Sequence, residues 1–337
     1  MAVKCICFMK NVKLYFRKLN FLKILVSLLI SLFFFNSCGN KSTKSSKITI
    51  GFLDAFEDAT IAQAKQGFFV ALKDSGFNPE TNIEVIYRNA QGDIPVLGQS
   101  VDYFISQNVA LIVSNTTLST ITAVQKTSSI PVCMIVSPSP ELAGLRTKDG
   151  KDPVNLFGVY ETLEYIDTAL FLVKTLFPNA KRIGTLINQS EPQSRDALER
   201  IQKQAKAMGC EVVSVPANNS AETQLAAESL INKGIDVFFA LPDNTIFSSF
   251  ETIVKSCDAA KIPILTSEAG LVSRGALAAF GADIYAWGYE SGLEAVYYLK
   301  THKIRAPKKL LKRQRVYNPV KAKMFNIIPD STFQILQ

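Results

Sequence analysis

The chain has 337 residues, with 37 Lys and Arg, 29 Asp and Glu and a single histidine, for a formal net charge of +8. Six of the basic residues lie in the first 37, so residues 38–337 hold 31 basic against 29 acidic side chains and are nearly neutral. This balance gives no extended basic surface for nucleic acid, and the lone His302, in a basic segment, excludes a Ser/His or Cys/His nucleophile pair in a cleft.

The first 37 residues have the order of a secretory signal peptide: a basic region, a short apolar run and a small residue. The apolar run at residues 24–35 is shorter than the roughly 20 residues that a spanning helix needs. The stretch FNSCGN that follows resembles a bacterial lipobox, whose cysteine is acylated and begins the mature protein. We therefore expect a lipid on Cys38 and a location in the bacterial cell envelope, lipid-anchored on the extracytoplasmic, periplasmic face. A free cysteine after an ordinary signal is the alternative.

Residues 39–46, GNKSTKSS, are small and polar and predict a tether. After them, apolar runs of four to eight residues alternate with stretches of helical periodicity. The runs of the first set are KITIGFL, IEVIYRNA, VALIVSN and IPVCMIVS. The helix after the first run has one apolar face and ends at Gly76; the face consists of Ile61, Ala64, Phe68 and Leu72.

The same alternation restarts at Arg182 with RIGTLIN. A helix ended by Gly209 follows, with Leu198, Ile201, Ala205 and Met208 three and four apart, and EVVSVPA, VFFALPD and IPILTSE complete the set. Two such sets predict an α/β protein with two doubly wound parallel-sheet lobes, each sheet covered on both faces. The stretch LFGVYETLEYID at residues 156–167 separates the sets and is the candidate first hinge.

Polar residues follow six of the predicted strands, three in each lobe. The stretches are LDAFEDAT, SNTTLST and SPSPE in the first set, and NQSEPQS, PDNT and SEAG in the second. Ligands of open parallel sheets bind beyond the carboxyl ends of the strands, where the N–H groups of helix starts are unpaired. The six stretches therefore predict two polar rims that face each other across a cleft.

These rims suit a small zwitterion. Asn115, Thr116 and Thr117 precede a helix and form a cradle for an anion, and Ser190 and Ser194 flank Pro192 in a similar position. An α-amino group needs a carboxylate partner, and the candidates are Asp54, Glu57, Asp58, Asp243 and Glu268. The alternative for each residue is a helix N-cap, because Asn, Ser, Thr and Asp are preferred there.

Three cysteines remain in the body, Cys133, Cys210 and Cys257, at spacings that do not suit a metal. Cys133 and Cys257 lie in apolar surroundings, so small buried thiols are the favoured interpretation of these two over a disulfide or a zinc ligand. The segment at residues 300–315 holds eight basic residues and no acid. We interpret it as a solvated connector, with contact to anionic lipid headgroups as the alternative.

The usual motifs of enzymes are missing. The chain has no HExxH, GxxxxGK[ST] or GxGxxG, which are the zinc, nucleotide and dinucleotide signatures. The sequence therefore predicts no catalytic residue, no metal and no cofactor. An enzyme built on the same two-lobed architecture is a further hypothesis, which turnover of a ligand in the cleft would support.

Several motifs resemble those of the tryptophan/tyrosine-type ABC transporter substrate-binding proteins, over about residues 47–331. They are NIEVIYRNAQGD, VALIVSNTT, IGTLINQSEPQS, FALPDNTI, IPILTSEAGLVSRGALAAFGADIYAWG and YNPVKAKMFNIIPD. The resemblance implies a type I periplasmic-binding-protein fold with a three-segment hinge. The expected first lobe is residues 47–158 with about 284–314, and the second is residues 159–283 with about 315–337, after a signal peptide at 1–37 and a tether at 38–46.

The resemblance also implies a function. Members bind aromatic amino acids and pass them to a membrane permease driven by an ATPase. The residues that match are Asn115, Thr116, Thr117, Ser137, Ser190, Glu191, Pro192, Asp243, Asn244, Thr245, Ser267 and Glu268. In the PDNT turn, we expect Pro242 and Asn244 to shape the backbone and Asp243 and Thr245 to contact the ligand. A lipoprotein sensor that reports to a signalling partner is the alternative.

The chain departs from the family in the first loop, where Glu57, Asp58 and Ala59 stand in place of a frequent Glu-His-Pro. The change alters the wall of the first lobe, so tryptophan specificity does not carry over. Glu57 stays a ligand candidate. Phe52 and Phe56 could stack on a planar ligand or belong to the core, and the core is favoured for Phe52 because it lies within a strand.

Overall fold

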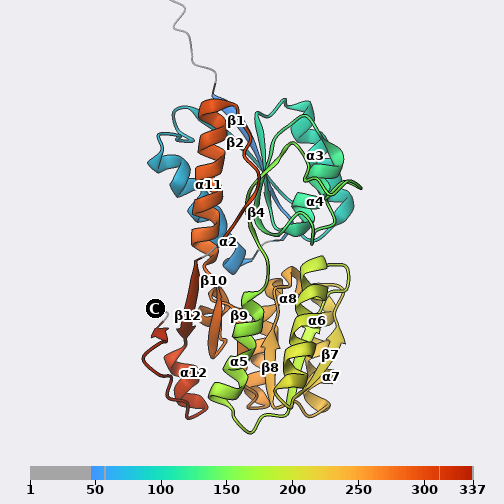
Figure 1. The fold of residues 1–337 in the computed structure, drawn as a ribbon, viewed down its shortest axis with the longest axis vertical. Coiled ribbons are helices and arrows are strands. Elements are labelled where there is room, and N and C mark those ends of the chain that lie inside the picture. The colour runs from blue at the N-terminus through green and yellow to red at the C-terminus, as the bar shows by residue number, and fades with distance from the viewer. Residues whose placement is uncertain (1–46, 57, 311, 336–337) are drawn as a thin grey trace, which may run out of the picture. The chain divides into compact units, whose positions relative to one another are not determined.

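The computed structural model describes residues 47–335 except Glu57 and Leu311, and the chain from Lys47 onward forms one compact unit (Figure 1). The predicted signal peptide, the tether, Cys38 and Glu57 lie outside the described residues. Within the described ranges, no helix is both long and apolar enough to cross a membrane. Residues 39–337 contain the whole compact unit and suffice for measurements of binding and stability.

Six parallel strands form the first sheet, in the order β11-β5-β4-β3-β1-β2. They are β1 (Ile48–Asp54), β2 (Ile83–Asn89), β3 (Leu111–Asn115), β4 (Val132–Pro138), β5 (Leu156–Glu161) and β11 (Lys308–Lys309). Helices α2 (Ala59–Asp74) and α11 (Ile284–Thr301) cover one face, and α3 (Ile94–Ser106) and α4 (Thr117–Lys126) cover the other (Figure 1). We call the body built on this sheet the first lobe.

Both faces of this sheet are buried, which explains its uninterrupted apolar strands. In β1, Phe52 packs edge-on against Phe68 of α2, with 5.9 Å between ring centroids, whereas Leu53 lies in the cluster of Phe104 on α3. The predicted apolar face of α2 is confirmed, because all four of its residues are buried. Phe52 is fully buried and part of the core, as favoured.

Seven strands form the second sheet, in the order β13-β12-β10-β9-β8-β6-β7. They are β6 (Arg182–Ile187), β7 (Glu211–Pro216), β8 (Val237–Ala240), β9 (Ile264–Glu268), β10 (Ala278–Ala282), β12 (Arg313–Tyr317) and β13 (Gln334–Ile335). Among the described pairings of this sheet, β10–β12 alone is antiparallel. The expected α/β class with two doubly wound sheets is confirmed. We call this body the second lobe.

Helices cover the second sheet on both faces. On one face, α5 (Tyr165–Leu176) packs against α6 (Pro192–Ala207), and on the other α7 (Thr223–Asn232) packs against α9 (Phe250–Ala259). Three short helices complete the lobe, which are α8 (Asn244–Ser248), α10 (Gly270–Ser273) and α12 (Pro319–Met324), together with a 3-10 turn at Ser220–Glu222.

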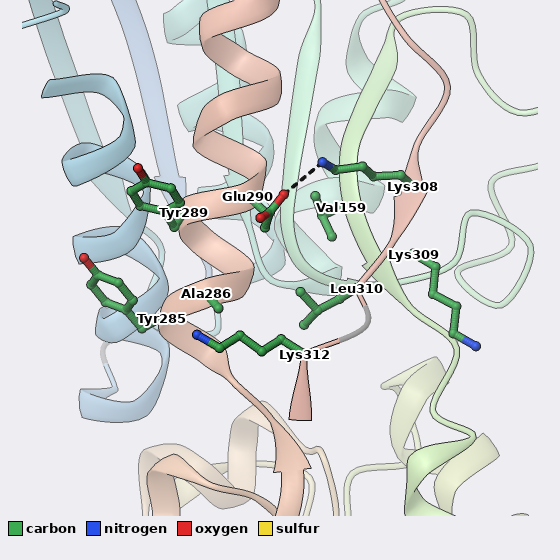
Figure 2. A pocket seen from close by; sticks show the side chains of 9 residues that line it. All are labelled: Val159, Tyr285, Ala286, Tyr289, Glu290, Lys308, Lys309, Leu310 and Lys312. Atoms are coloured by element: carbon green, nitrogen blue, oxygen red, sulfur yellow. Dashed lines mark hydrogen bonds and ion pairs between the residues drawn. The ribbon is translucent and has the colours of Figure 1, made fainter. Parts of the chain in front are cut away.

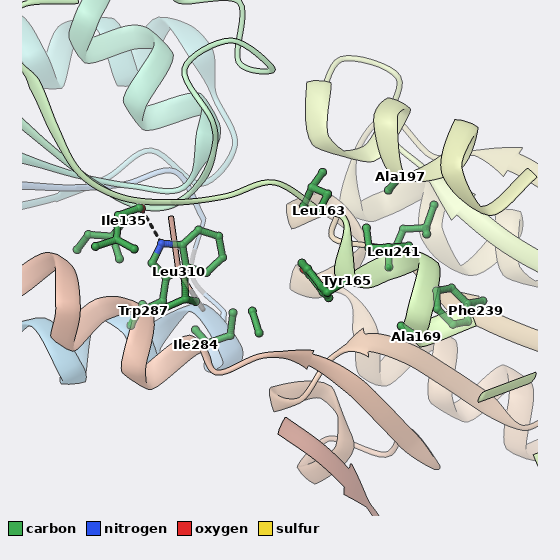
Figure 3. Close-up of a cluster of buried hydrophobic side chains, with 14 of the residues drawn as sticks. Ile135, Leu163, Tyr165, Ala169, Ala197, Phe239, Leu241, Ile284, Trp287 and Leu310 are labelled. Atoms are coloured by element: carbon green, nitrogen blue, oxygen red, sulfur yellow. Dashed lines mark hydrogen bonds between the residues drawn. The ribbon is translucent and has the colours of Figure 1, made fainter. Parts of the chain in front are cut away.

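Three crossings join the lobes, from β5 to α5, from β10 to α11 and from β11 to β12. One cluster of buried apolar side chains runs across them, from Trp287 and Leu310 in the first lobe to Leu163, Tyr165 and Phe239 toward the second (Figure 3). Separate clusters lie under α3 and under α7 and α9. The lobes therefore share an apolar core at the hinge side.

The structure corrects two expectations about the connections. The first half of the stretch expected to be the first hinge is strand β5 of the first sheet, so the crossing begins only after Glu161. The basic segment is not a solvated connector throughout, because it contains β11 and the start of β12. Its Arg313 is mostly buried and pairs with Glu161.

Cys133 and Cys257 are buried and form no disulfide, as interpreted from the sequence, and the same holds for Cys210. Burial raises the pKa of the Cys257 thiol to about 12 and that of Cys133 as well, so both are protonated at neutral pH.

Candidate functional site

The carboxyl ends of strands from both sheets border a cavity of about 30 Å³. The first lobe contributes four residues to its lining, and the second lobe with the first crossing contributes seven. The residues are Thr117, Val136, Pro138 and Trp287, then Leu163, Tyr165, Gln193, Pro242, Asn244, Phe247 and Glu268. The lining combines aromatic rings and apolar groups with one carboxyl group.

The first-lobe wall carries polar atoms without a partner. Asn115 donates from Nδ2 to Asp54 Oδ1 at 2.6 Å, while its Oδ1 has no hydrogen-bond partner among the described residues. Thr116 Oγ1 and Ser137 Oγ are buried and unpartnered in the same sense. A buried polar group without a partner costs about 1–3 kcal/mol, and these three atoms lie at two adjacent strand ends, in residues that do not themselves line the cavity. Among the lining residues, Gln193 Oε1 is buried without a partner in the described chain.

The backbone around the cavity is strained. Thr116, Val136 and Leu163 have φ values of 80°, 49° and 62°, in the region that side chains other than glycine rarely adopt. At Val136 the β4–β5 register shifts, between Met134 and Ser137. Such strain persists where the surrounding structure enforces it, and it gathers at ligand-binding sites.

The second-lobe wall is organised by two buried carboxyl groups. Glu191 accepts from the backbone N–H groups of Asn244 and Thr245, at 3.0 and 3.1 Å, and from both of their side chains. Asp243 caps α8 through Ile246 N–H and accepts from Asn188 N–H and Ser194 Oγ, both at 2.6 Å. Burial raises the pKa of Glu191 to about 8, and its proximity to Asp243 adds to the rise.

In the PDNT turn, the two residues expected to shape the backbone line the cavity, and the two expected to contact the ligand do not. Pro242 and Asn244 line the cavity, whereas Asp243 and Thr245 are bonded within the second lobe. For Asp243 the helix-cap alternative describes its contacts. The sequence does not indicate which side chains of a tight turn point outward, because that depends on the neighbouring Glu191.

Glu268 stands at the end of β9 and lines the cavity with Tyr165. The Tyr165 hydroxyl donates to Glu268 Oε1 at 2.5 Å, and the Arg313 guanidinium lies 4.7 Å above the Tyr165 ring. Burial raises the pKa of Glu268 to about 8, an effect that the Tyr165 hydrogen bond opposes. Among the residues that line the cavity, Glu268 is the one that carries a carboxyl group.

The remaining candidates do not line the cavity, and neither do Asn115, Thr116 and Ser137 at the first-lobe strand ends. Ser190 is exposed and bonds to Asn188 Oδ1, and Pro192 begins α6. Ser267 is buried, and its Oγ has no partner within the described chain, but it is not among the lining residues. Phe56 is half-buried and packs on the α3-side cluster. The structure leaves Glu57 undescribed.

The sequence analysis did not find the aromatic lining. Trp287 donates its indole N–H to the Val159 carbonyl at 2.7 Å, which fixes the ring between α11 and β5. Tyr165 and Phe247 complete the set. The available signal was the position of Tyr165, Trp287 and Phe247, which follow the last residues of β5, β10 and β8 by four, five and seven places.

A larger groove of about 560 Å³ lies on the first lobe beside α11 and β11 (Figure 2). Its three lysines already have acidic partners. Lys308 pairs with Glu290 and Glu294, Lys309 with Glu164 and Lys312 with Asp283, all within 3.1 Å. Every lysine that lines the groove is therefore neutralised, and the same pairs argue against lipid-headgroup contact by this part of the basic segment.

Comparison with known proteins identifies the family. A family model described as ABC transporter substrate binding protein matches residues 49–327. The chain belongs to this family of substrate-binding proteins. The match confirms the resemblance read from the motifs. The family consists of solute-binding proteins and not enzymes, and its members act outside the cytoplasm.

Three proteins of known description are similar to this substrate-binding protein. It is 38% identical, over 258 residues, to a tyrosine-binding protein of Clostridioides difficile (strain R20291), covering 76% of this chain and 74% of the relative. A Streptococcus pneumonia ABC domain in complex with L-Trp superposes with a TM-score of 0.78 at 25% identity, over 85% and 97% of the two chains. A ligand-free, open substrate-binding protein with adhesive properties, from Clostridium difficile, gives 0.63 at 28% identity, over 86% and 99%.

Proposed function

We propose that this protein binds an amino acid, preferably an aromatic one, in the cavity between its lobes, as the extracytoplasmic receptor of an ABC importer. It then delivers the ligand to a membrane permease driven by an ATPase. The 38% identity to a tyrosine-binding protein supports the class of ligand. The observation that carries the proposal is a single cavity lined by aromatic rings, one buried carboxyl group and the unpartnered Oε1 of Gln193, with further unpartnered polar atoms in Thr116 and Ser137, next to the lining residues Thr117 and Pro138.

Each part of an aromatic amino acid has a counterpart in this site. The hydroxyl groups of Thr116 and Ser137 and the N-terminus of α4 are donors for the carboxylate. Glu268 is the partner of the ammonium group, which favours the ionised carboxylate. Trp287 and Phe247 offer ring faces to the side chain.

Binding requires the cavity to change shape. Ligand pockets usually measure about 300–1,000 Å³, whereas this cavity measures about 30 Å³. A ligand therefore enters when the lobes separate at the three crossings, and the lobes close again around it. The lobes that move are residues 47–161 with about 284–310, and about 162–283 with 313–335, which places the whole of β5 in the first lobe and the whole of β12 in the second. The lower TM-score with an open relative, 0.63 against 0.78, supports a closed arrangement here.

The ligand is tested by thermal denaturation of residues 39–337 with each standard amino acid, the aromatic ones first. We expect saturable stabilisation by L-tyrosine, L-tryptophan or L-phenylalanine, because a ligand that binds only the folded state raises the melting temperature. The matched aromatic acids without an amino group should stabilise much less, since they lack the partner of Glu268. Flat curves with every amino acid would contradict the proposal.

Lipid attachment at Cys38 and delivery to a permease complete the proposal. The stretch FNSCGN supports the first, and the family supports the second. Labelling of the full chain with a fatty acid in a bacterial host, lost in Cys38→Ala, tests the anchor. Neighbouring genes for a permease and an ATPase would favour transport over the sensor alternative, and a neighbouring kinase or receptor gene would favour sensing.

A further inference from the structure

Arg274 follows α10 in the second lobe and is held there by three hydrogen bonds. Its guanidinium donates to both carboxylate oxygens of Glu251, at 2.7 and 2.8 Å, and to the Phe247 carbonyl at 2.7 Å. The guanidinium carbon lies 5.6 Å from the centroid of the Phe250 ring. The side chain is only 10% exposed, so its direction is fixed by the second lobe.

The remaining nitrogen, Nη1, reaches the first lobe. It donates to Asp58 Oδ2 and, at 3.1 Å, to Thr60 Oγ1. The other oxygen of Asp58 caps α2 by accepting from the N–H groups of Thr60 and Ile61, at 2.8 and 2.9 Å. One carboxylate thus serves its own helix with Oδ1 and the opposite lobe with Oδ2, and its side chain is fully buried.

The backbones beside this ion pair are in close contact. A Cβ built on Gly270 of α10 would lie 2.5 Å from Thr60 Cγ2 and 3.4 Å from Thr60 Cβ. Ile61, the next residue in α2, is buried within the apolar cluster of Ala269, Leu271 and Val272 in the second lobe. The start of α2 and the α10 turn therefore meet without room for one more methyl group.

We propose that Asp58 and Arg274 form a latch that holds the lobes closed, with Gly270 permitting the contact. The inference rests on the proposed opening and closing of the lobes. On opening, Arg274 keeps Glu251 and Phe247, Asp58 keeps its cap, and only the bonds between the lobes are exchanged for water. The latch lies outside the cavity lining, so it sets the fraction of closed protein, and through that fraction the apparent affinity.

The closed fraction can be measured without any ligand. The Cβ separation of 3.4 Å between positions 60 and 270 is close to the about 3.5–4.5 Å of disulfides. In Thr60→Cys/Gly270→Cys, a disulfide forms only when the lobes close, and the three native cysteines are buried. The rate of its formation under an oxidant such as oxidised glutathione reports closure.

We expect Asp58→Asn to slow this trapping about ten-fold, because an asparagine side chain still caps α2 but cannot form the ion pair. The matched control is Asp102→Asn, which removes an exposed ion pair with Lys126 inside the first lobe and should leave the rate unchanged. Equal trapping rates with and without the Asp58→Asn substitution, or no disulfide in any chain, would overturn the latch.

A second test uses the contact itself. Gly270→Ala should weaken amino-acid binding by about ten-fold, because its methyl group meets Thr60 Cγ2. Thr60→Ser removes Cγ2 and keeps the hydroxyl that Arg274 reaches, so Gly270→Ala/Thr60→Ser should recover most of the affinity. An unchanged affinity in Gly270→Ala would overturn the proposed contact. A third outcome separates the two proposals. If disulfide trapping depends on Asp58 but the protein binds no amino acid, the proposed ligand is rejected and the latch is retained.

Discussion

The hydroxyl of Tyr165 donates to Glu268 Oε1 at 2.5 Å, and both residues line the cavity between the lobes. Tyr165 begins α5 just after the first crossing, and Glu268 ends β9. The bond therefore ties the proposed ammonium partner to the hinge. Arg313 extends this connection. It is the first residue of β12, after the third crossing, and it lies over the Tyr165 ring and pairs with Glu161, the last residue of β5 before the first crossing.

Replacing Glu268 by Gln should weaken binding of the aromatic amino acid by about ten-fold to a hundred-fold. The amide keeps the shape and the contact with Tyr165 but removes the charge that meets the ammonium group. Calorimetric titration measures the change. Tyr165→Phe, which leaves the carboxylate in place, should have the smaller effect, and equal effects of the two variants would argue against an ammonium site at Glu268.

Glu268 should also make the ligand-free protein less stable as the pH rises from about 5 to 8. Its pKa of about 8 in the folded state exceeds the ordinary value of 4.5, so the folded state binds more protons between these values. Stability is therefore highest below pH 4.5 as far as this group is concerned, and it falls by at most about 1.4 kcal/mol per pH unit up to pH 8. Denaturant unfolding of the parent and of Glu268→Gln isolates this contribution. If the free energy of unfolding of the parent fell no more steeply with pH than that of Glu268→Gln, this contribution of Glu268 would be contradicted.

Glu191→Gln should destabilise the second lobe by about 2–3 kcal/mol. Both oxygens of the Glu191 carboxyl group accept hydrogen bonds from Asn244 and Thr245 in a fully buried place, and the amide replaces one of them by a nitrogen that cannot accept. Urea unfolding gives the value. Glu199→Gln, on the exposed side of the same helix, should change the free energy of unfolding by less than about 0.5 kcal/mol. Similar losses in both would show that the network around Glu191 is not what stabilises the turn.

Gly288→Ala should cost about 3 kcal/mol of stability in the first lobe. A Cβ there would lie 1.9 Å from the Ala64 carbonyl oxygen, so α2 and α11 would have to separate. Gly98→Ala is the matched control in α3, where the nearest atom is 3.4 Å away in the flexible Lys126 side chain. We expect it to stabilise the protein by about 0.5–1 kcal/mol. Thermal melting that ranks the two variants in the opposite order would contradict the packing described here.

The sequence predicted those features that depend on local pattern. Periodicity predicted the two sheets, and the resemblance named Glu268, which the structure places in the cavity lining. The sequence did not predict strand β10, because its small residues AAFGA carry little strand signal. Its Gly281 lies so close to the Ser267 carbonyl that no side chain fits there. Pairings such as Asp58 with Arg274 join positions 216 residues apart, and no local pattern reports them.

The measurement that tests the central claim most directly is the fluorescence of Trp287, the only tryptophan in the chain, during titration with L-tyrosine and L-phenylalanine. Because its ring lines the cavity, a ligand between the lobes must change its surroundings. We predict a saturable change in emission that matches the calorimetric binding curve and is strongly reduced in Glu268→Gln. Calorimetric binding without any change in Trp287 emission would place the ligand elsewhere and contradict the account.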